Sequence, residues 1–240
     1  MLNCTITNNV TGWNGVNAGG IYVTGGLASN CLVRANQVSQ ATKSVASSRG
    51  GGVYQTGGLV VNCEATDNKS HSVASTAGGG GVYLGGGILR NVLIARNYAF
   101  MNGGGLYLTA GAAQNCTVAS NTTAGAGGGV WMSGGSVSNS IAYFNAPENL
   151  SQSGGAIEYS CVAPPPAAGD GNIDADPAFV DAASGNWRLA DNSPCLGKGR
   201  NQGWMETATD LDGNPRIRGI VVDMGAYELL PPRGTLILLR

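Results

Sequence analysis

The sequence predicts an all-β solenoid, and three repeated features of its first 160 residues support this prediction. Glycine pairs, or a glycine and an alanine, are followed directly by an apolar residue and usually then by an aromatic one. An asparagine lies nine residues after that apolar residue in the first five repeats, and a second asparagine lies six residues later. All variation in repeat length therefore falls between the second asparagine and the next glycines, which is typical of a solenoid with insertions on one side.

Each repeat reads as short strands separated by bends. The apolar markers are Ile21, Val53, Val82, Leu106, Val130 and Ile157. Around them apolar residues alternate with other residues, and a period of two is that of β-strands. Glycine makes up 40 of 240 residues, which argues against helical repeats and suits tight bends. Short parallel strands stacked at about 4.8 Å per coil make a parallel β-helix over residues 1–160.

Two asparagine columns accompany the coils. The first is Asn3, Asn30, Asn62, Asn91, Asn115 and Asn139; the second is Asn9, Asn36, Asn68, Asn97, Asn121 and Asn145. We expect them to stack at equivalent bends, where side-chain amides bond along the column and asparagine tolerates a left-handed backbone. Six N-x-[ST] sequences, at Asn3, Asn9, Asn68, Asn115, Asn121 and Asn149, are mostly by-products of these columns and are a poor indication of glycosylation.

Four of the six cysteines share one repeat position. They are Cys4, Cys31, Cys63 and Cys116, and Val92 and Ser140 fill the same position in other coils. Interchange with valine indicates a small buried slot, so we expect buried free thiols facing the apolar markers. Cys63 and Cys116 are two coils apart, about 9.6 Å, which is too far for a disulfide. Only Cys4–Cys31 or Cys31–Cys63 are near enough, and no zinc-binding cysteine motif is present.

Aromatic residues form a third column. Tyr22, Tyr54, Tyr83, Tyr107 and Trp131 each follow an inward-facing apolar marker, so a period of two turns them outward. We expect the rings to stack at one strand spacing per coil, beside the insertions 10–18, 37–50 and 69–79. An exposed aromatic stripe is a candidate platform for a sugar chain. The alternative is that the rings only stabilise the sheet, as cross-strand aromatic pairs do.

The repeat ends near residue 160, and the acidic and proline content then rises. Residues 161–229 are predicted to form an irregular C-terminal cap, and 230–240 a tail or truncated linker. "DADPAFVDAASGNWRLADNSPC" and "DLDGNPR…VDMGAYE" in this part, with the Gly-Gly-apolar-aromatic coils, resemble the choice-of-anchor Q domain family. More loosely, the coils resemble polymorphic outer-membrane adhesins. The first resemblance covers almost the whole chain; it implies a right-handed, pectin-lyase-like β-helix in an exported bacterial protein, and it brings no catalytic residue.

An enzyme is the alternative function, because related folds often host polysaccharide lyases and glycoside hydrolases, although fold alone does not establish function. Such sites need clustered carboxylates. Residues 1–160 contain only Glu64, Asp67, Glu148 and Glu158, and Asp67 aligns with Arg96, which predicts a surface salt bridge. Asp210 and Asp212 lie in "DLDGN", whose glycine does not fit a calcium-binding EF-hand loop, so we expect a turn rather than a structural calcium site.

The charge and hydropathy of the sequence argue against nucleic acid as a binding partner and against a transmembrane helix. The net charge of −1 provides no basic surface for nucleic acid, and no apolar run approaches the length of a transmembrane helix. The chain starts within a coil and shows no signal peptide, so we interpret it as a fragment. We therefore expect an extracellular or cell-surface module, non-catalytic, acting as a stalk, an adhesin or a binder of polysaccharide or cell-surface glycan. No cofactor is expected.

Overall fold

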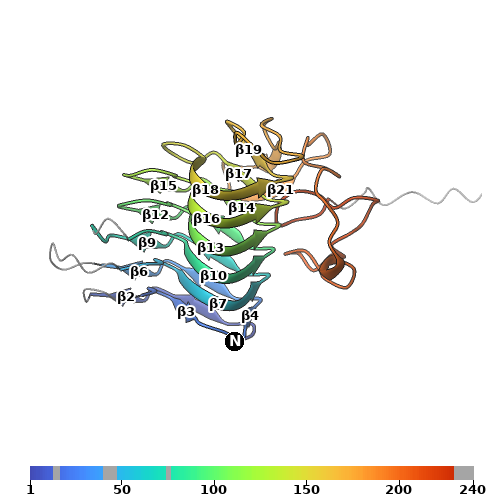
Figure 1. The fold of residues 1–240 in the computed structure, drawn as a ribbon. Helices are drawn as coiled ribbons and strands as arrows, with labels where there is room; N and C mark the ends of the chain where they lie inside the picture. The colour runs from blue at the N-terminus through green and yellow to red at the C-terminus, as the bar shows by residue number, and fades with distance from the viewer. Residues whose placement is uncertain (13–16, 40–47, 74–76, 230–240) are drawn as a thin grey trace, which may run out of the picture.

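A computed structural model describes residues 1–12, 17–39, 48–73 and 77–229. Three parallel sheets run along a stack of coils (Figure 1). Sheet A contains β3 (Ile21–Val23), β4 (Leu27–Ser29), β7 (Val53–Val61), β10 (Val82–Arg90), β13 (Leu106–Gln114), β16 (Val130–Ser138) and β18 (Leu150–Glu158). Sheet B contains β1 (Thr5–Thr7), β5 (Leu32–Arg34), β8 (Glu64–Thr66), β11 (Leu93–Ala95), β14 (Thr117–Ala119), β17 (Ile141–Tyr143) and β19 (Cys161–Val162).

The third sheet is formed by the first residues of the predicted insertions and was not predicted. Sheet C contains β2 (Val10–Thr11), β6 (Gln37–Val38), β9 (Lys69–Ser70), β12 (Tyr98–Ala99) and β15 (Thr122–Thr123). The other described residues hold an antiparallel pair, β20 (Phe179–Asp181) and β21 (Asn186–Leu189), and one short 3-10 helix, η1 (Gly203–Met205). The architecture is the predicted parallel β-helix. Parts of all three predicted insertions, and the tail 230–240, lie outside the described residues.

Strand register confirms the repeat and corrects its last coil. Val82 pairs with Leu106 and Tyr83 with Tyr107, as the aligned repeats predicted. In the last coil, however, Val130 pairs with Leu150, so the marker Ile157 was wrong. The pair Gly154–Gly155 lies in the middle of β18, where the nine-residue strands bend, and not at the start of the coil as the earlier glycine pairs do.

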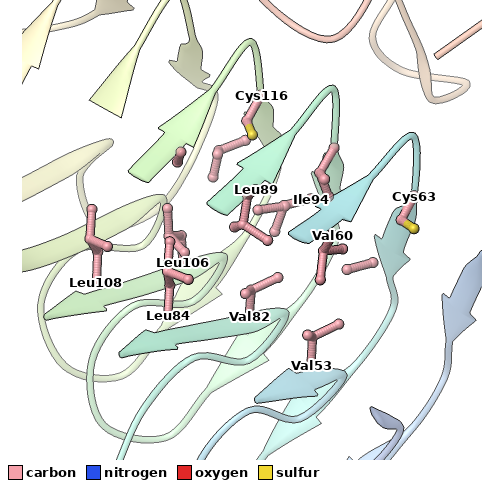
Figure 2. Packing of buried hydrophobic residues seen from close by; sticks show 14 of the residues in the cluster. Val53, Val60, Cys63, Val82, Leu84, Leu89, Ile94, Leu106, Leu108 and Cys116 are labelled. Atoms are coloured by element: carbon pink, nitrogen blue, oxygen red, sulfur yellow. The ribbon is translucent and has the colours of Figure 1, made fainter. Parts of the chain in front are cut away.

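Apolar side chains from sheets A and B fill the interior of the coils. Figure 2 shows Val82, Leu89 and Ile94 pointing into this core, together with the two labelled cysteines, Cys63 and Cys116. Cys31, Cys63 and Cys116 are buried, and Cys4, in the first coil, is partly buried. The inward orientation predicted for the cysteine column is therefore confirmed. All six cysteines of the chain are free thiols in this structure.

The second asparagine column is a continuous buried ladder. The main-chain N–H and the side-chain Nδ2 of Asn97 both donate to Oδ1 of Asn121, each at 2.9 Å. The same pair of bonds joins Asn68 to Asn97 and Asn121 to Asn145. The amide of Asn97 also donates to the carbonyl oxygen of Ala65, at 2.8 Å. Every polar atom of the buried side chain is thus satisfied, which a buried amide requires.

The glycine pairs make room for this ladder. A Cβ atom on Gly81 would lie 2.6 Å from Nδ2 of Asn97, and one on Gly105 would lie 2.7 Å from Nδ2 of Asn121. Such contacts are too short for any side chain, so only glycine fits. The glycines and the asparagines therefore recur together because one column packs directly against the other.

The first asparagine column forms the turns between sheets A and B. All six residues have φ between 50° and 53°, the left-handed region that asparagine tolerates. From Asn62 onward their side chains bond to the returning C-terminal segment, and some also bond to one another. Nδ2 of Asn91 donates to the carbonyl oxygen of Thr209 at 2.7 Å, and Nδ2 of Asn139 donates to that of Arg200 at 2.9 Å. This column therefore helps to fasten the rest of the chain.

The C-terminal segment, residues 174–229, lies along the outer face of sheet B (Figure 1, orange and red). Trp187 and Tyr227 pack on Leu93 and Ala119 there. Only the residues just before this segment lie over the last coil, where the main-chain N–H of Ile173 donates to the carbonyl oxygen of Ser160. One side of the β-helix is thus covered by a layer without any repeat.

A buried ionic network holds the end of this segment. The guanidinium of Arg216 is fully buried and contacts Oε1 of Glu228 at 3.0 Å, and it donates to the carbonyl oxygens of Asp223 and Gly225. Burial raises the pKa of Glu228 to about 8; Arg216 opposes this rise, and the negative charge of Asp223 adds to it. The carboxylates of the closing motif are therefore structural partners within the layer that covers sheet B.

Candidate functional site

The aromatic column forms the predicted stack along sheet A. Ring centroids are 4.9 Å apart between Tyr22 and Tyr54, 5.0 Å between Tyr54 and Tyr83, and 4.9 Å between Tyr83 and Tyr107. Tyr107 and Trp131 are 4.2 Å apart and nearly parallel, with 20° between their planes. The spacing follows the rise of one coil, because the rings occupy equivalent positions in paired strands.

The prediction that the whole column is exposed was wrong. Only 7 % of Tyr54, 8 % of Tyr83 and 5 % of Tyr107 is accessible to solvent. The chain that leads into the Val82 coil lies against the Tyr107 ring, because a Cβ atom on Gly78 would be 2.2 Å from Cδ2 of Tyr107. The guanidinium of Arg49 lies 5.3 Å from the centre of the Tyr83 ring. The rings in the middle of the column are therefore buried and contribute to packing.

The two ends of the column remain accessible. Tyr22 is 53 % exposed and Trp131 is partly exposed. Two residues further along these strands, on the same outer face, are exposed hydroxyl side chains: Thr24, Thr56, Ser133 and Ser153. The outer face of sheet A thus combines hydroxyl groups with aromatic rings at the two ends of the ladder.

An aromatic residue that sequence reasoning missed lies at the other margin of sheet A. Trp204, in η1, has the guanidinium of Arg90 4.5 Å from its ring centre. Its Nε1 donates to Oε1 of Gln202, which also accepts from Nε2 of Gln114. Because Arg90 and Gln114 end β10 and β13, Trp204 borders the far end of these strands. No repeat pattern indicates this residue, since it belongs to the unique segment.

The carboxylates on the coils each have a structural partner or neighbour. Asp67 bonds to Arg34 and Arg96, at 3.0 and 2.9 Å, which confirms the predicted salt bridge. Partial burial opposes ionisation of Asp67, but the hydrogen bond and the charge of Arg96 lower its pKa below the usual range. Glu158 pairs with Arg200 at 3.0 Å, and Glu148 accepts from the main-chain N–H of Gly127 at 2.6 Å.

Asp210 and Asp212, the two aspartates considered as calcium ligands, bond to groups of the protein itself. Oδ1 of Asp210 accepts the main-chain N–H groups of Asp212 and Asn214, and its Oδ2 accepts that of Glu228. Asp212 turns outward and pairs with Arg188, whose Nε is 2.6 Å from its carboxylate. Within the described ranges, no three histidine, cysteine or acidic side chains gather as a metal site requires. "DLDGN" forms a turn closed by Asp210.

Three of the asparagines in N-x-[ST] sequences are fully buried. Asn68 and Asn121 belong to the inner ladder, and Asn115 lies under the C-terminal segment, where its Nδ2 donates to the carbonyl oxygen of Asp223. The side-chain amides of these three asparagines are therefore buried and hydrogen-bonded within the fold, where a glycan could not be attached.

Comparison with known proteins agrees with this architecture. The family model described as a right handed beta helix region matches residues 2–146, which is more than half of the chain. No curated protein and no solved structure matched the chain. No helix within the described residues is long and apolar enough to cross a membrane. The matched coils, the parallel register and the stacked columns lead to one conclusion: the chain belongs to the right-handed β-helix family.

Proposed function

We propose that this chain is a non-catalytic module of a secreted or cell-surface bacterial protein and binds a glycan on the outer face of sheet A. One observation carries the proposal: exposed hydroxyl groups lie beside the accessible ring of Trp131. Sugar rings offer apolar faces to aromatic side chains and hydroxyl groups to polar ones. Ser133 lies on the same strand as Trp131, and Ser153 lies on the neighbouring strand.

The resemblance to the choice-of-anchor Q domain family supports the location. Its most specific part is the closing motif, "DLDGNPR…VDMGAYE". In this structure the motif fastens a layer over sheet B, while Trp131 on sheet A stays partly exposed. The looser resemblance to polymorphic outer-membrane adhesins is in accord with a surface role.

The surroundings of the carboxylates favour binding over hydrolysis or elimination. A glycosidase needs two carboxyl groups that flank the bond to be cleaved. On the coils, Asp67, Glu148 and Glu158 are instead held by arginines or by a main-chain N–H group. An enzyme of the pectin-lyase-like kind remains the competing function in the experiment below.

A glycan array probed with the whole chain tests the proposal. We expect binding to a polysaccharide or a cell-surface glycan, weakened about tenfold or more by Trp131→Ala. Phe100→Ala is the control, because Phe100 is an exposed aromatic outside sheet A, and it should leave binding unchanged. The double variant Tyr83→Ala/Tyr107→Ala removes two buried rings, so we expect its main effect to be a loss of folding stability and not a direct loss of glycan binding. A binding that survives Trp131→Ala, or an array without any hit, contradicts the proposal.

The competing enzyme is tested on the same protein. The chain is incubated with pectin, alginate and similar polymers in the presence of calcium, and new chain ends are measured. We expect none. Turnover that disappears when a named carboxylate such as Glu64 is replaced by its amide would overturn the non-catalytic assignment.

A further inference from the structure

Two of the six thiols lie outside the cysteine column and face each other. Cys161 belongs to β19, and Ser160, the residue before it, occupies the column position, so the side chain of Cys161 points away from the interior of the coils. Cys195 belongs to the segment that covers sheet B. Both residues are fully buried in one apolar cluster with Ile141, Leu189 and Met224. One cysteine therefore comes from each of the two layers.

The backbones on both sides are held in place. The main-chain N–H of Cys161 donates to the carbonyl oxygen of Ser140 at 2.8 Å. The carbonyl oxygen of Cys195 accepts from the main-chain N–H of Met224 at 3.1 Å, and its own N–H donates to Oγ of Ser193. The Cys161 thiol donates to the carbonyl oxygen of Ala175 at 3.2 Å and is also close enough to the Cys195 thiol to interact with it; this interaction and burial both raise the pKa of Cys161.

We propose that Cys161 and Cys195 form a disulfide that fastens the C-terminal segment to sheet B when the chain folds in the presence of a disulfide oxidant. Oxidised glutathione or the active-site disulfide of a thiol oxidase is the class of oxidant required. One thiolate attacks the oxidant disulfide and releases one thiol, and the second cysteine then displaces the other. The two electrons and two protons of the cysteines end on the two sulfurs of the oxidant.

A second close pair shows why the facing arrangement matters. The N–H of Cys31 donates to the sulfur of Cys63 at 3.3 Å, yet these residues are stacked neighbours next to the register pair Leu32–Glu64. Their Cα–Cβ bonds run parallel, about one strand spacing of 4.8 Å apart, whereas a disulfide needs Cβ atoms about 3.8 Å apart. Cys161 and Cys195 approach from opposite layers, so no such spacing holds them apart.

The bond forms during folding. The thiolate is the reactive form, and the raised pKa and full burial of Cys161 suppress it in the native state. We therefore expect reduced native protein to oxidise slowly and refolding protein to oxidise readily.

Counting thiols after refolding tests this proposal. The whole chain is refolded in a mixture of reduced and oxidised glutathione, unfolded again and alkylated. Of the six cysteines, all but two should react, and a non-reducing digest should yield one peptide pair joined through Cys161 and Cys195. Six alkylated cysteines, or a bond between any other pair, would overturn the proposal.

Two serine variants sharpen the result. Cys195→Ser should lose the bond, so that every remaining cysteine is alkylated, while Cys63→Ser should keep it. The proposal is also contradicted if the wild type shows no disulfide at Cys161 and Cys195→Ser forms a disulfide between two other cysteines. If Cys195→Ser does not fold, the peptide map of the wild type alone decides.

Discussion

The coils and the C-terminal segment are held by different kinds of contact. Within the coils, hydrogen bonds of one type recur between residues 24 to 32 positions apart, as in the asparagine ladder. The segment bonds to coil residues as far as 147 positions away, at irregular separations such as 42 and 61, and each of these contacts occurs once. Stability of the coils is therefore a sum of similar interfaces, whereas the segment depends on a few unique residues.

Removing one rung of the inner ladder should have the largest effect. Asn97→Ala deletes an amide with four side-chain hydrogen bonds and leaves buried partners on Asn68, Asn121 and Ala65. We expect the free energy of unfolding to fall by about 4 kcal/mol, because each unsatisfied buried group costs about 1–3 kcal/mol. Denaturant unfolding followed by circular dichroism measures this loss.

Asn115→Ala is the comparison in the outer column. Its amide makes only longer bonds, at 3.3 and 3.4 Å, so we expect a loss of about 1–2 kcal/mol, part of it from the left-handed backbone. Equal losses at the two positions would contradict the difference between the columns.

Changing pH should affect the segment next most strongly. Because burial raises the pKa of Glu228 to about 8, the folded chain holds this proton more tightly than the unfolded chain does. The stabilising contribution is complete below about pH 4.5, the ordinary value, and is lost as pH rises through 8. We expect a loss on the order of 4 kcal/mol between these limits.

Glu228→Gln should flatten this dependence in melting curves recorded from pH 5 to 9. Glu158→Gln, which alters the exposed pair with Arg200, serves as the control and should leave the slope unchanged. Identical pH slopes in the wild type and in Glu228→Gln would show that this carboxyl does not titrate as described.

A glycine in the coils should matter more than one in the segment. Gly81→Ala places a Cβ atom 2.6 Å from Nδ2 of Asn97, and we expect a loss of about 2 kcal/mol from overpacking. A Cβ atom on Gly213 meets nothing within 4 Å, so Gly213→Ala should cost only about 1 kcal/mol, from its φ of 84°. Thermal denaturation of both variants gives the ranking, and the reverse order would contradict the packing of glycines on the ladder.

The smallest effect is expected at the surface ion pairs. Asp67→Asn removes the charge that Arg34 and Arg96 share but keeps a residue that tolerates the φ of 58°. Because exposed pairs contribute about 0–1 kcal/mol, we expect a loss of about 0.5 kcal/mol that shrinks further in high salt. A loss as large as that of Asn97→Ala would mean that surface ion pairs stabilise the coils as much as the buried asparagine ladder does, which contradicts this prediction.

Much of the β-helix was predictable because its contacts repeat in the sequence. Glycine pairs, asparagines and inward cysteines recur at fixed spacing, and each spacing reflects one column of direct contacts. The last coil was misread because Gly154–Gly155 resembles the glycine pairs that begin earlier coils, although it marks the bend inside β18. Composition alone does not separate these two glycine positions, since both simply exclude a Cβ atom.

What covers each face was not predictable from the repeat. Periodicity turned Tyr83 and Tyr107 outward correctly, but it said nothing of the variable chain that lies against them. Trp204 and Arg216 act through contacts that occur once, between parts of the chain far apart in sequence. Such contacts leave no pattern in a single sequence, so the margin of sheet A and the network behind sheet B were missed.

The asparagine ladder also has an electrical consequence. Every rung donates toward the following coil, so all the side-chain dipoles point the same way and their polarisation adds along the axis. The series ends at Asn149, whose Oδ1 accepts from Nδ2 of Asn145 and whose own Nδ2 donates a hydrogen bond to the carbonyl oxygen of Ala163 at 2.7 Å. This carbonyl ends the series of aligned amides, and the common direction of their dipoles gives the two ends of the ladder opposite polarity.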